Sequence, residues 1–123
     1  MGEITVTPLT PRIGAEIAGV DLRETLSGGE VARLKQALAD HMVLFFRDQQ
    51  IDHESHKRFG RDFGDLALHS AVPGIEGHPE IVAIHADAGS KYVAGEDWHS
   101  DLTCDAEPPL GSILYLHTEG LSP

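Results

Sequence analysis

His99 and Asp101 are the residues of this chain whose types and spacing best suit a chemical role. In a β-strand, side chains two residues apart point to the same face, so both could reach one metal ion if this segment is a strand. A neutral imidazole and a carboxylate are two of the three protein ligands in the 2-His-1-carboxylate triad of non-haem Fe(II) oxygenases. The pattern H-x-D is short, and the alternative is a surface histidine near an aspartate.

Several longer motifs accompany this pair in a fixed order. They are TPL at residues 7–9, IGAEI at 13–17, GVDL at 19–22, VLFFRDQ at 43–49, FGRDFG at 59–64, EDWHSDLT at 96–103 and EPPLGSIL at 107–114. Together they resemble the amino-terminal portion of the TauD/TfdA (taurine dioxygenase) family of Fe(II)/2-oxoglutarate-dependent dioxygenases. Ordered motifs are far more specific than H-x-D alone, and these extend over almost the whole chain.

The resemblance implies a fold and a reaction. We expect a mixed α+β, β-rich structure in which residues 1–123 form a single domain, an incomplete part of a double-stranded β-helix (jelly roll) with flanking helices. The complete enzyme would hydroxylate a small, anionic organic substrate such as a sulfonate, a sulfate ester or a carboxylate. Fe(II) would be held by His99, Asp101 and a histidine near the family's carboxyl terminus, which leaves positions for 2-oxoglutarate and O2.

By the same resemblance, His69 and Leu102 contact the substrate. His69 aligns with the family histidine that binds the anionic group, and Leu102 follows the iron-binding aspartate; a solvated loop histidine is the alternative for His69. The family member that acts on taurine has a tyrosine where this chain has Val72 and an asparagine where it has Gly95. These two differences argue against taurine as the substrate.

The second iron histidine and the arginine that binds 2-oxoglutarate in the family have no counterpart in this sequence. His117 follows Asp101 too closely, and the other histidines precede the iron-binding segment. We therefore expect a fragment or a truncated gene product that is inactive by itself. Its unpaired strand edges would favour aggregation or a homo-oligomer.

Two other functions stay open. The first is a non-catalytic binding or assembly module with at most a weak metal site at His99 and Asp101. The second is a metal-dependent hydrolase, which ranks last because no H-E-x-x-H motif accompanies the pair.

Composition excludes several classes of partner. Nine Lys and Arg against 20 Asp and Glu give a net charge of −11, which repels nucleic acid and anionic lipid. The amino terminus lacks the pattern of a secretory leader, and no apolar run approaches the ~18 residues of a membrane span. We therefore predict a cytoplasmic protein without a membrane span. Cys104 is the single cysteine, and we predict a packing role for it.

Apolar patterns predict where the regular elements lie. Strands are expected at residues 4–7, 13–18, 43–46, 81–84 and 112–117, and the wholly apolar third strand is expected to be buried on both faces. Ser27 and Glu30 have the spacing of a capping box, which predicts a helix from that point. The apolar stripe of this helix would consist of Val31, Leu34, Leu38 and Met42.

A second helix is predicted from a cap at Asp52 to Phe63, ended by Gly64. Phe59 would lie on its inner face, one turn before Phe63. We predict that the two histidines of this helix, His53 and His56, are solvated rather than metal ligands.

Overall fold

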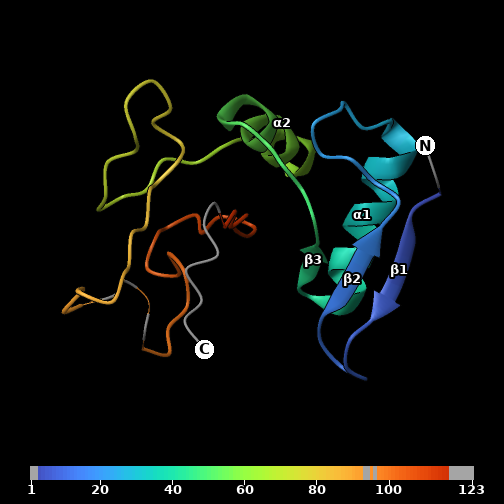
Figure 1. Cartoon of the computed structure of the whole chain (residues 1–123), viewed down its shortest axis with the longest axis horizontal. Coiled ribbons are helices and arrows are strands. Elements are labelled where there is room, and N and C mark those ends of the chain that lie inside the picture. Colours follow the sequence, from blue (N-terminus) through green and yellow to red (C-terminus); the bar gives the residue numbers. More distant parts are fainter. Residues whose placement is uncertain (1–2, 93–94, 96, 117–123) are drawn as a thin grey trace. The chain divides into compact units, whose positions relative to one another are not determined.

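The structure is a computed structural model that describes residues 3–92, 95 and 97–116 (Figure 1). The chain divides into two compact units, Met1–Asp65 and Leu66–Pro123. Every helix and strand of the described residues belongs to the first unit. The expectation of a single domain over the whole chain stays a prediction, since parts of one domain can also form separate compact units.

A three-stranded sheet in the order β1–β2–β3 lies in the first unit. β1 (Thr5–Pro8) pairs antiparallel with β2 (Ala15–Ala18), and β2 pairs parallel with β3 (Leu44–Phe46). The first three predicted strands are therefore confirmed, with ends shifted by one or two residues. The mixed α+β class is confirmed as well. In the described residues, however, the helices are longer than the strands, so the β-rich character is not observed there.

α1 (Gly28–His41) begins with the predicted capping box. The Ser27 hydroxyl accepts a hydrogen bond from the Glu30 amide at 3.1 Å, and the Glu30 carboxylate accepts one from the Ser27 amide at 3.0 Å. Both bonds satisfy amides that helix geometry leaves unpaired. Leu34 is fully buried, but Met42 is 61% exposed. Including Met42 in the apolar stripe was wrong, because this residue is the C-cap and its φ of 68° turns it out of the helix.

α2 (His53–Phe63) also has the predicted ends. The Asp52 carboxylate accepts a hydrogen bond from a first-turn amide at 2.7 Å, and Gly64 is the C-cap. Its histidines, His53 and His56, are half-buried rather than fully solvated.

One hydrophobic core joins the sheet to the two helices. Its buried side chains are Ile4, Ile17, Leu22, Leu34, Ala37 and Phe59. The Phe59 ring packs edge-on against Phe46 and Phe63, with ring centroids 5.4 and 5.3 Å apart. Val43 and Phe45 are 41% and 39% exposed. The prediction of a strand buried on both faces was therefore wrong, because β3 is an edge of the described sheet and packs through one face.

The second unit contains turns and bends but no helix or strand among its described residues. An isolated bridge pairs Ile75 with His78. The strands predicted at residues 81–84 and 112–117 are not formed in this part of the chain, although His117 itself lies outside the described residues. A strand requires a partner to satisfy its backbone groups, and the apolar pattern alone does not provide one.

Many apolar side chains of the second unit are exposed. They are Leu68, Val72, Ile84, Tyr92, Trp98, Leu110, Ile113, Leu114 and Leu116. Cys104 is exposed too, so the predicted packing role for it is wrong.

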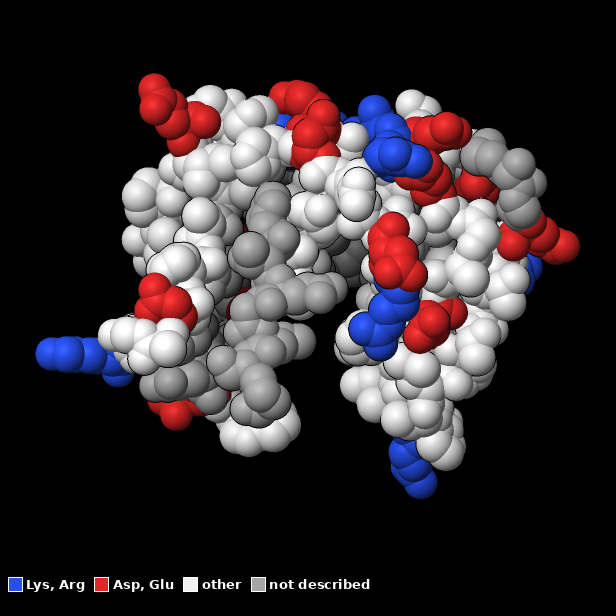
Figure 2. All heavy atoms as spheres, in the orientation of Figure 1, with Lys and Arg blue, Asp and Glu red and all other residues white. Residues whose placement is uncertain are grey.

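Charge is distributed over the surface as the composition predicts. In Figure 2, acidic side chains form several separate groups among uncharged residues, and basic side chains are fewer and stand singly or in small groups. Within the described residues, neither helix has the length and apolarity needed to cross a membrane.

We expect Ser27→Ala to lower the free energy of unfolding by about 1 kcal/mol, because an α1 amide loses its acceptor. Ser27→Gly is the control and should cost only a few tenths of a kcal/mol, since glycine is a tolerated N-cap. Urea denaturation followed by the helical circular dichroism signal measures both. Equal stability of the Ala variant and the wild type would show that the capping box does not stabilise α1.

Candidate metal centre

His99 and Asp101 lie in the second unit with their donor atoms close together. The distance from His99 Nε2 to Asp101 Oδ1 is 3.1 Å, and the side chains are 51% and 61% exposed. Two ligands bonded to one ion at about 2.1 Å and at a right angle stand about 3.0 Å apart. The pair therefore fits two adjacent positions of an octahedral ion such as Fe(II), and the metal-binding role stays a prediction.

A backbone carbonyl sets the orientation of the imidazole ring. His99 Nδ1 is 2.7 Å from the carbonyl oxygen of Asp97. Because a carbonyl can only accept, Nδ1 carries the hydrogen, and in the neutral ring the Nε2 lone pair faces Asp101. The hydrogen bond to Asp97, together with the negative charge of Asp101, raises the pKa of His99 above its ordinary value. A metal ion at Nε2 would replace the proton that this environment favours.

The other carboxylate oxygen of the pair is held by a hydroxyl. Ser112 Oγ donates to Asp101 Oδ2 at 3.3 Å. This bond leaves Oδ1 directed at His99, and such contacts commonly orient metal ligands. Sequence reasoning assigned Ser112 to a strand and missed this contact, because a hydroxyl eleven residues away leaves no pattern in the local sequence.

The backbone around the pair is not the strand that would place both side chains on one face. Residues 97–103 form bends and a turn. Leu102 has a φ of 52°, in the left-handed region that bulky side chains rarely adopt, and its carbonyl accepts from the Asp105 amide at 3.1 Å. The two donors are brought together by local hydrogen bonds rather than by strand geometry. Trp98, the neighbour of His99, is fully exposed.

His69 is exposed, and backbone groups orient its ring as well. Its Nδ1 accepts from the amides of Ala71 and Val72, each at 3.0 Å. In the neutral ring the hydrogen is therefore on Nε2, which can donate to an oxygen of a ligand. The substrate-binding roles of His69 and of the half-buried Leu102 stay predictions.

A second H-x-D pair is present in the same unit. His85 Nε2 is 3.1 Å from Asp87 Oδ2, the same separation as in the first pair. Asp87 Oδ1, however, accepts from the Gly89 amide at 2.9 Å and from the Ser90 hydroxyl at 3.2 Å. The hydrogen bond with His85, and after it those from Gly89 and Ser90, lower the pKa of Asp87. The bonds from Gly89 and Ser90 also hold its carboxylate in a turn. Sequence reasoning did not consider this pair.

The pair formed by His99 and Asp101 is a site of two donors. In the described ranges, no group of three or more His, Cys, Asp or Glu side chains is placed to hold a metal ion. A third protein ligand would have to come from outside these residues.

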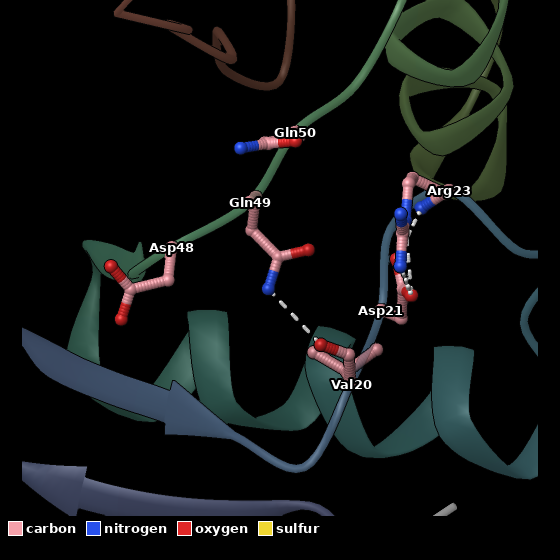
Figure 3. Close-up of a pocket in the computed structure, with 6 residues that line it drawn as sticks. All are labelled: Val20, Asp21, Arg23, Asp48, Gln49 and Gln50. Atoms are coloured by element: carbon pink, nitrogen blue, oxygen red, sulfur yellow. Dashed lines mark hydrogen bonds and ion pairs between the residues drawn. The ribbon is translucent and has the colours of Figure 1, made fainter.

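The first unit contains an open polar cavity of about 300 Å³, shown in Figure 3. It is lined by Val20, Asp21, Arg23, Asp48, Gln49 and Gln50. The side-chain amide of Gln49 donates through Nε2 to the backbone carbonyl of Val20 at 3.0 Å and accepts through Oε1 from the backbone amide of Leu22 at 2.9 Å. These bonds connect the chain after β3 to the chain after β2, which indicates a structural rather than a chemical role.

Comparison with known proteins finds a matching family and similar sequences. Residues 5–121 match the family described as "Taurine catabolism dioxygenase TauD, TfdA family". The chain is 34% identical over 113 residues to an alpha-ketoglutarate-dependent sulfate ester dioxygenase of Pseudomonas putida. The matched segment makes up 91% of this chain and 36% of the relative. It is also 36% identical over 114 residues to an alkylsulfatase of Acinetobacter baylyi. Here the matched segment makes up 91% of this chain and 35% of the relative. It thus spans about a third of the length of these curated relatives.

Solved structures give a similar result. A taurine dioxygenase from Burkholderia xenovorans is 43% identical with a TM-score of 0.58, over 62% of this chain and 28% of that chain. AAD-2, in complex with Mn(II) and N-oxalylglycine, is 31% identical with a TM-score of 0.51, over 52% of this chain and 25% of that chain. The likeness supports the fold prediction for roughly that share of the residues, and the completeness of the jelly roll stays a prediction.

We expect Ser112→Ala to weaken Mn(II) binding by roughly tenfold, the low end of the effect of removing a group that orients a metal ligand. Mn(II) electron paramagnetic resonance, which reports free ion, measures the dissociation constant. Ser100→Ala is the matched control, because the Ser100 hydroxyl pairs with Thr103 Oγ1 at 2.8 Å instead. Equal affinities of the two variants would contradict the role given to Ser112.

We expect the Asp21 carboxyl to titrate far below its usual range. The Arg23 guanidinium, 2.7 Å away, lowers its pKa from 3.8 to about 2 through side-chain hydrogen bonds. Because the pKa is lowered in the folded state, the stabilisation is complete above the unfolded value and is lost as pH falls through about 2. Carboxyl NMR titration should show Arg23→Gln moving the midpoint up toward 3.8, whereas Arg12→Gln should not. An unshifted midpoint in Arg23→Gln would rule out this cause.

Proposed function

Since the chain belongs to the taurine catabolism dioxygenase TauD, TfdA family, we propose that the protein carrying it is an Fe(II)- and 2-oxoglutarate-dependent dioxygenase. The observation that carries the proposal is the arrangement of His99 and Asp101: Nε2 and Oδ1 lie 3.1 Å apart, while the Asp97 carbonyl and the Ser112 hydroxyl hold the other nitrogen and the other oxygen. The ligands of a related structure are consistent with it, since AAD-2 was crystallised with Mn(II) and N-oxalylglycine.

Bound Fe(II), 2-oxoglutarate and O2 would supply an oxidation in which 2-oxoglutarate becomes succinate and CO2 while a substrate C–H bond becomes C–OH. The residues of this chain would prepare the metal position. His99 offers Nε2 because the Asp97 carbonyl holds the hydrogen on Nδ1, and Asp101 offers Oδ1 because Ser112 holds Oδ2. Both ligands are thus oriented before a metal binds.

We further propose that the substrate is a small organic anion, with a sulfate ester or a sulfonate as the leading class. His69 supports this, because its ring presents an Nε2–H donor to an anionic oxygen. The relatives support it too: one is a sulfate ester dioxygenase and another, from Saccharomyces cerevisiae, is a sulfonate dioxygenase. Val72 and Gly95, at positions where the taurine-acting member has larger polar residues, make taurine itself the less favoured choice.

We expect the chain to bind Mn(II) through the first H-x-D pair. His99→Ala and Asp101→Ala should each abolish binding measured by electron paramagnetic resonance, because one remaining donor cannot hold the ion against water. His85→Ala and Asp87→Ala are matched controls, since that pair has the same spacing and the same 3.1 Å separation. Binding that depends on His85 and not on His99 would move the metal site to the second pair.

A chimera extends this test to activity. In it, the chain replaces the segment that it matches in the P. putida relative, and succinate formation is measured with Fe(II), 2-oxoglutarate, O2 and an alkyl sulfate. Succinate that depends on His99 and not on His85 supports the proposal. A chimera that binds Mn(II) but forms no succinate would contradict the dioxygenase proposal and support the non-catalytic metal-binding module. The 123-residue chain alone should form no succinate at an enzymatic rate.

A further inference from the structure

The edge of the sheet at β3 presents backbone groups that β2 does not use. Among the described residues, β3 pairs with β2 alone (Figure 1). The Val43 carbonyl accepts from the Ala15 amide at 2.9 Å, and successive residues of a strand direct their backbone groups to opposite sides. Leu44 and Phe46 therefore direct their amides and carbonyls away from β2. A further strand at this side would satisfy two donors and two acceptors.

Exposed apolar side chains lie beside this edge. In the described part of the first unit, the large apolar side chains that are exposed are Leu9, Ile13, Met42, Val43 and Phe45. They come from the loop between β1 and β2 and from the start of β3, and these segments adjoin. A Cβ atom built on Gly14 would be 3.9 Å from Leu9 Cβ and 3.7 Å from Phe45 Cε2. An open strand edge next to exposed apolar side chains is typical of a surface to which another strand binds.

The opposite edge of the sheet, at β1, has a different character. Its exposed side chains include Thr5 and Thr7, and the strand ends at Pro8, which has no amide hydrogen. Polar side chains and proline are features of sheet edges that stay unpaired. The β3 side is therefore the one suited to a further strand.

A second copy of this chain is the weaker candidate for the β3 edge. β3 has three residues, so two copies paired about a two-fold axis would share only the backbone groups of Leu44 and Phe46 from each. A stable dimer needs about 800 Å² buried on each partner, far more than three residues of strand provide. A strand of the same polypeptide needs no such area, because pairing within one chain does not cost the freedom of a second molecule.

The relatives are long enough to supply such a strand. The matched segment makes up 36% of the P. putida relative and 35% of the A. baylyi relative, so about two-thirds of their length lies outside it. We propose that an extended segment from the corresponding part of the protein pairs with β3 through the backbone of Leu44 and Phe46, and that its apolar side chains cover Phe45. The proposal rests on the proposed function in one respect, that this chain is part of a longer protein of the family.

The test measures hydrogen exchange of single amides by NMR, in the isolated chain and in the chimera with the P. putida relative. In the isolated chain, the amides of Leu44 and Phe46 should exchange fast at every protein concentration. The amide of Phe45, which is directed to β2, should be protected there. In the chimera, the amides of Leu44 and Phe46 should exchange at least about 100-fold more slowly, because a paired amide exchanges only when the structure opens.

A variant of the exposed face gives a second measurement. Phe45→Thr keeps a strand-forming residue and removes the ring. It should lower the midpoint of urea denaturation more in the chimera than in the isolated chain, where the ring is exposed. Thr5→Ser, on the exposed face of β1, is the matched control and should leave both midpoints unchanged. Equal effects of Phe45→Thr in the two proteins would show that no segment covers this face.

Fast exchange of both edge amides in a chimera that forms succinate would overturn the proposal and leave the proposed function in place. Slow exchange in the isolated chain would also overturn it: at all concentrations the chain itself would cover the edge, and only at high concentration a second copy would. A chimera that does not fold would count against the proposal, since the chain would then not accept the relative's strand. Slow exchange in a chimera that forms no succinate would support the pairing and contradict the dioxygenase instead.

Discussion

The hydrogen bond between His99 Nδ1 and the Asp97 carbonyl decides what the rest of the candidate site can do. It fixes the ring and its tautomer, so that in the neutral state a lone pair on Nε2 faces an anionic oxygen of Asp101 at 3.1 Å. Two such groups repel each other unless a cation lies between them, and the available cations are a proton and a metal ion. The hydrogen bond to the Asp97 carbonyl, and after it the negative charge of Asp101, raise the pKa of His99 and so favour a proton on Nε2 when no metal is bound.

Interactions close in sequence account for most of what could be predicted from the sequence. The capping box at Ser27 and Glu30 and the caps at Asp52 and Gly64 form as their spacing indicates, because each is complete within a few residues. The core follows from amphipathic helices meeting a short sheet, with Leu34 at its centre. The proximity of His99 and Asp101 belongs to the same class, since it too depends on neighbours in the chain.

The failed predictions share a dependence on partners that a local pattern does not specify. Residues 81–84 are an apolar run of the kind found in strands, but a strand exists through hydrogen bonds to another strand, and no strand pairs with them in the described residues. Phe45 was expected to be buried because both faces of β3 were expected to be covered, whereas only the face with Leu44 and Phe46 packs against the core. Ser112 was missed as part of the site for a related reason: a hydroxyl that contacts a carboxylate eleven residues away becomes visible only in three dimensions.

The two H-x-D pairs show why spacing alone does not define a metal site. Their donor atoms are equally far apart, and each carboxylate keeps one oxygen directed at its histidine while the other oxygen accepts hydrogen bonds. The distance and the carboxylate contacts therefore do not separate the two pairs. The pair of His99 and Asp101 has in addition a carbonyl, that of Asp97, which holds the hydrogen on His99 Nδ1 and directs the Nε2 lone pair at Asp101.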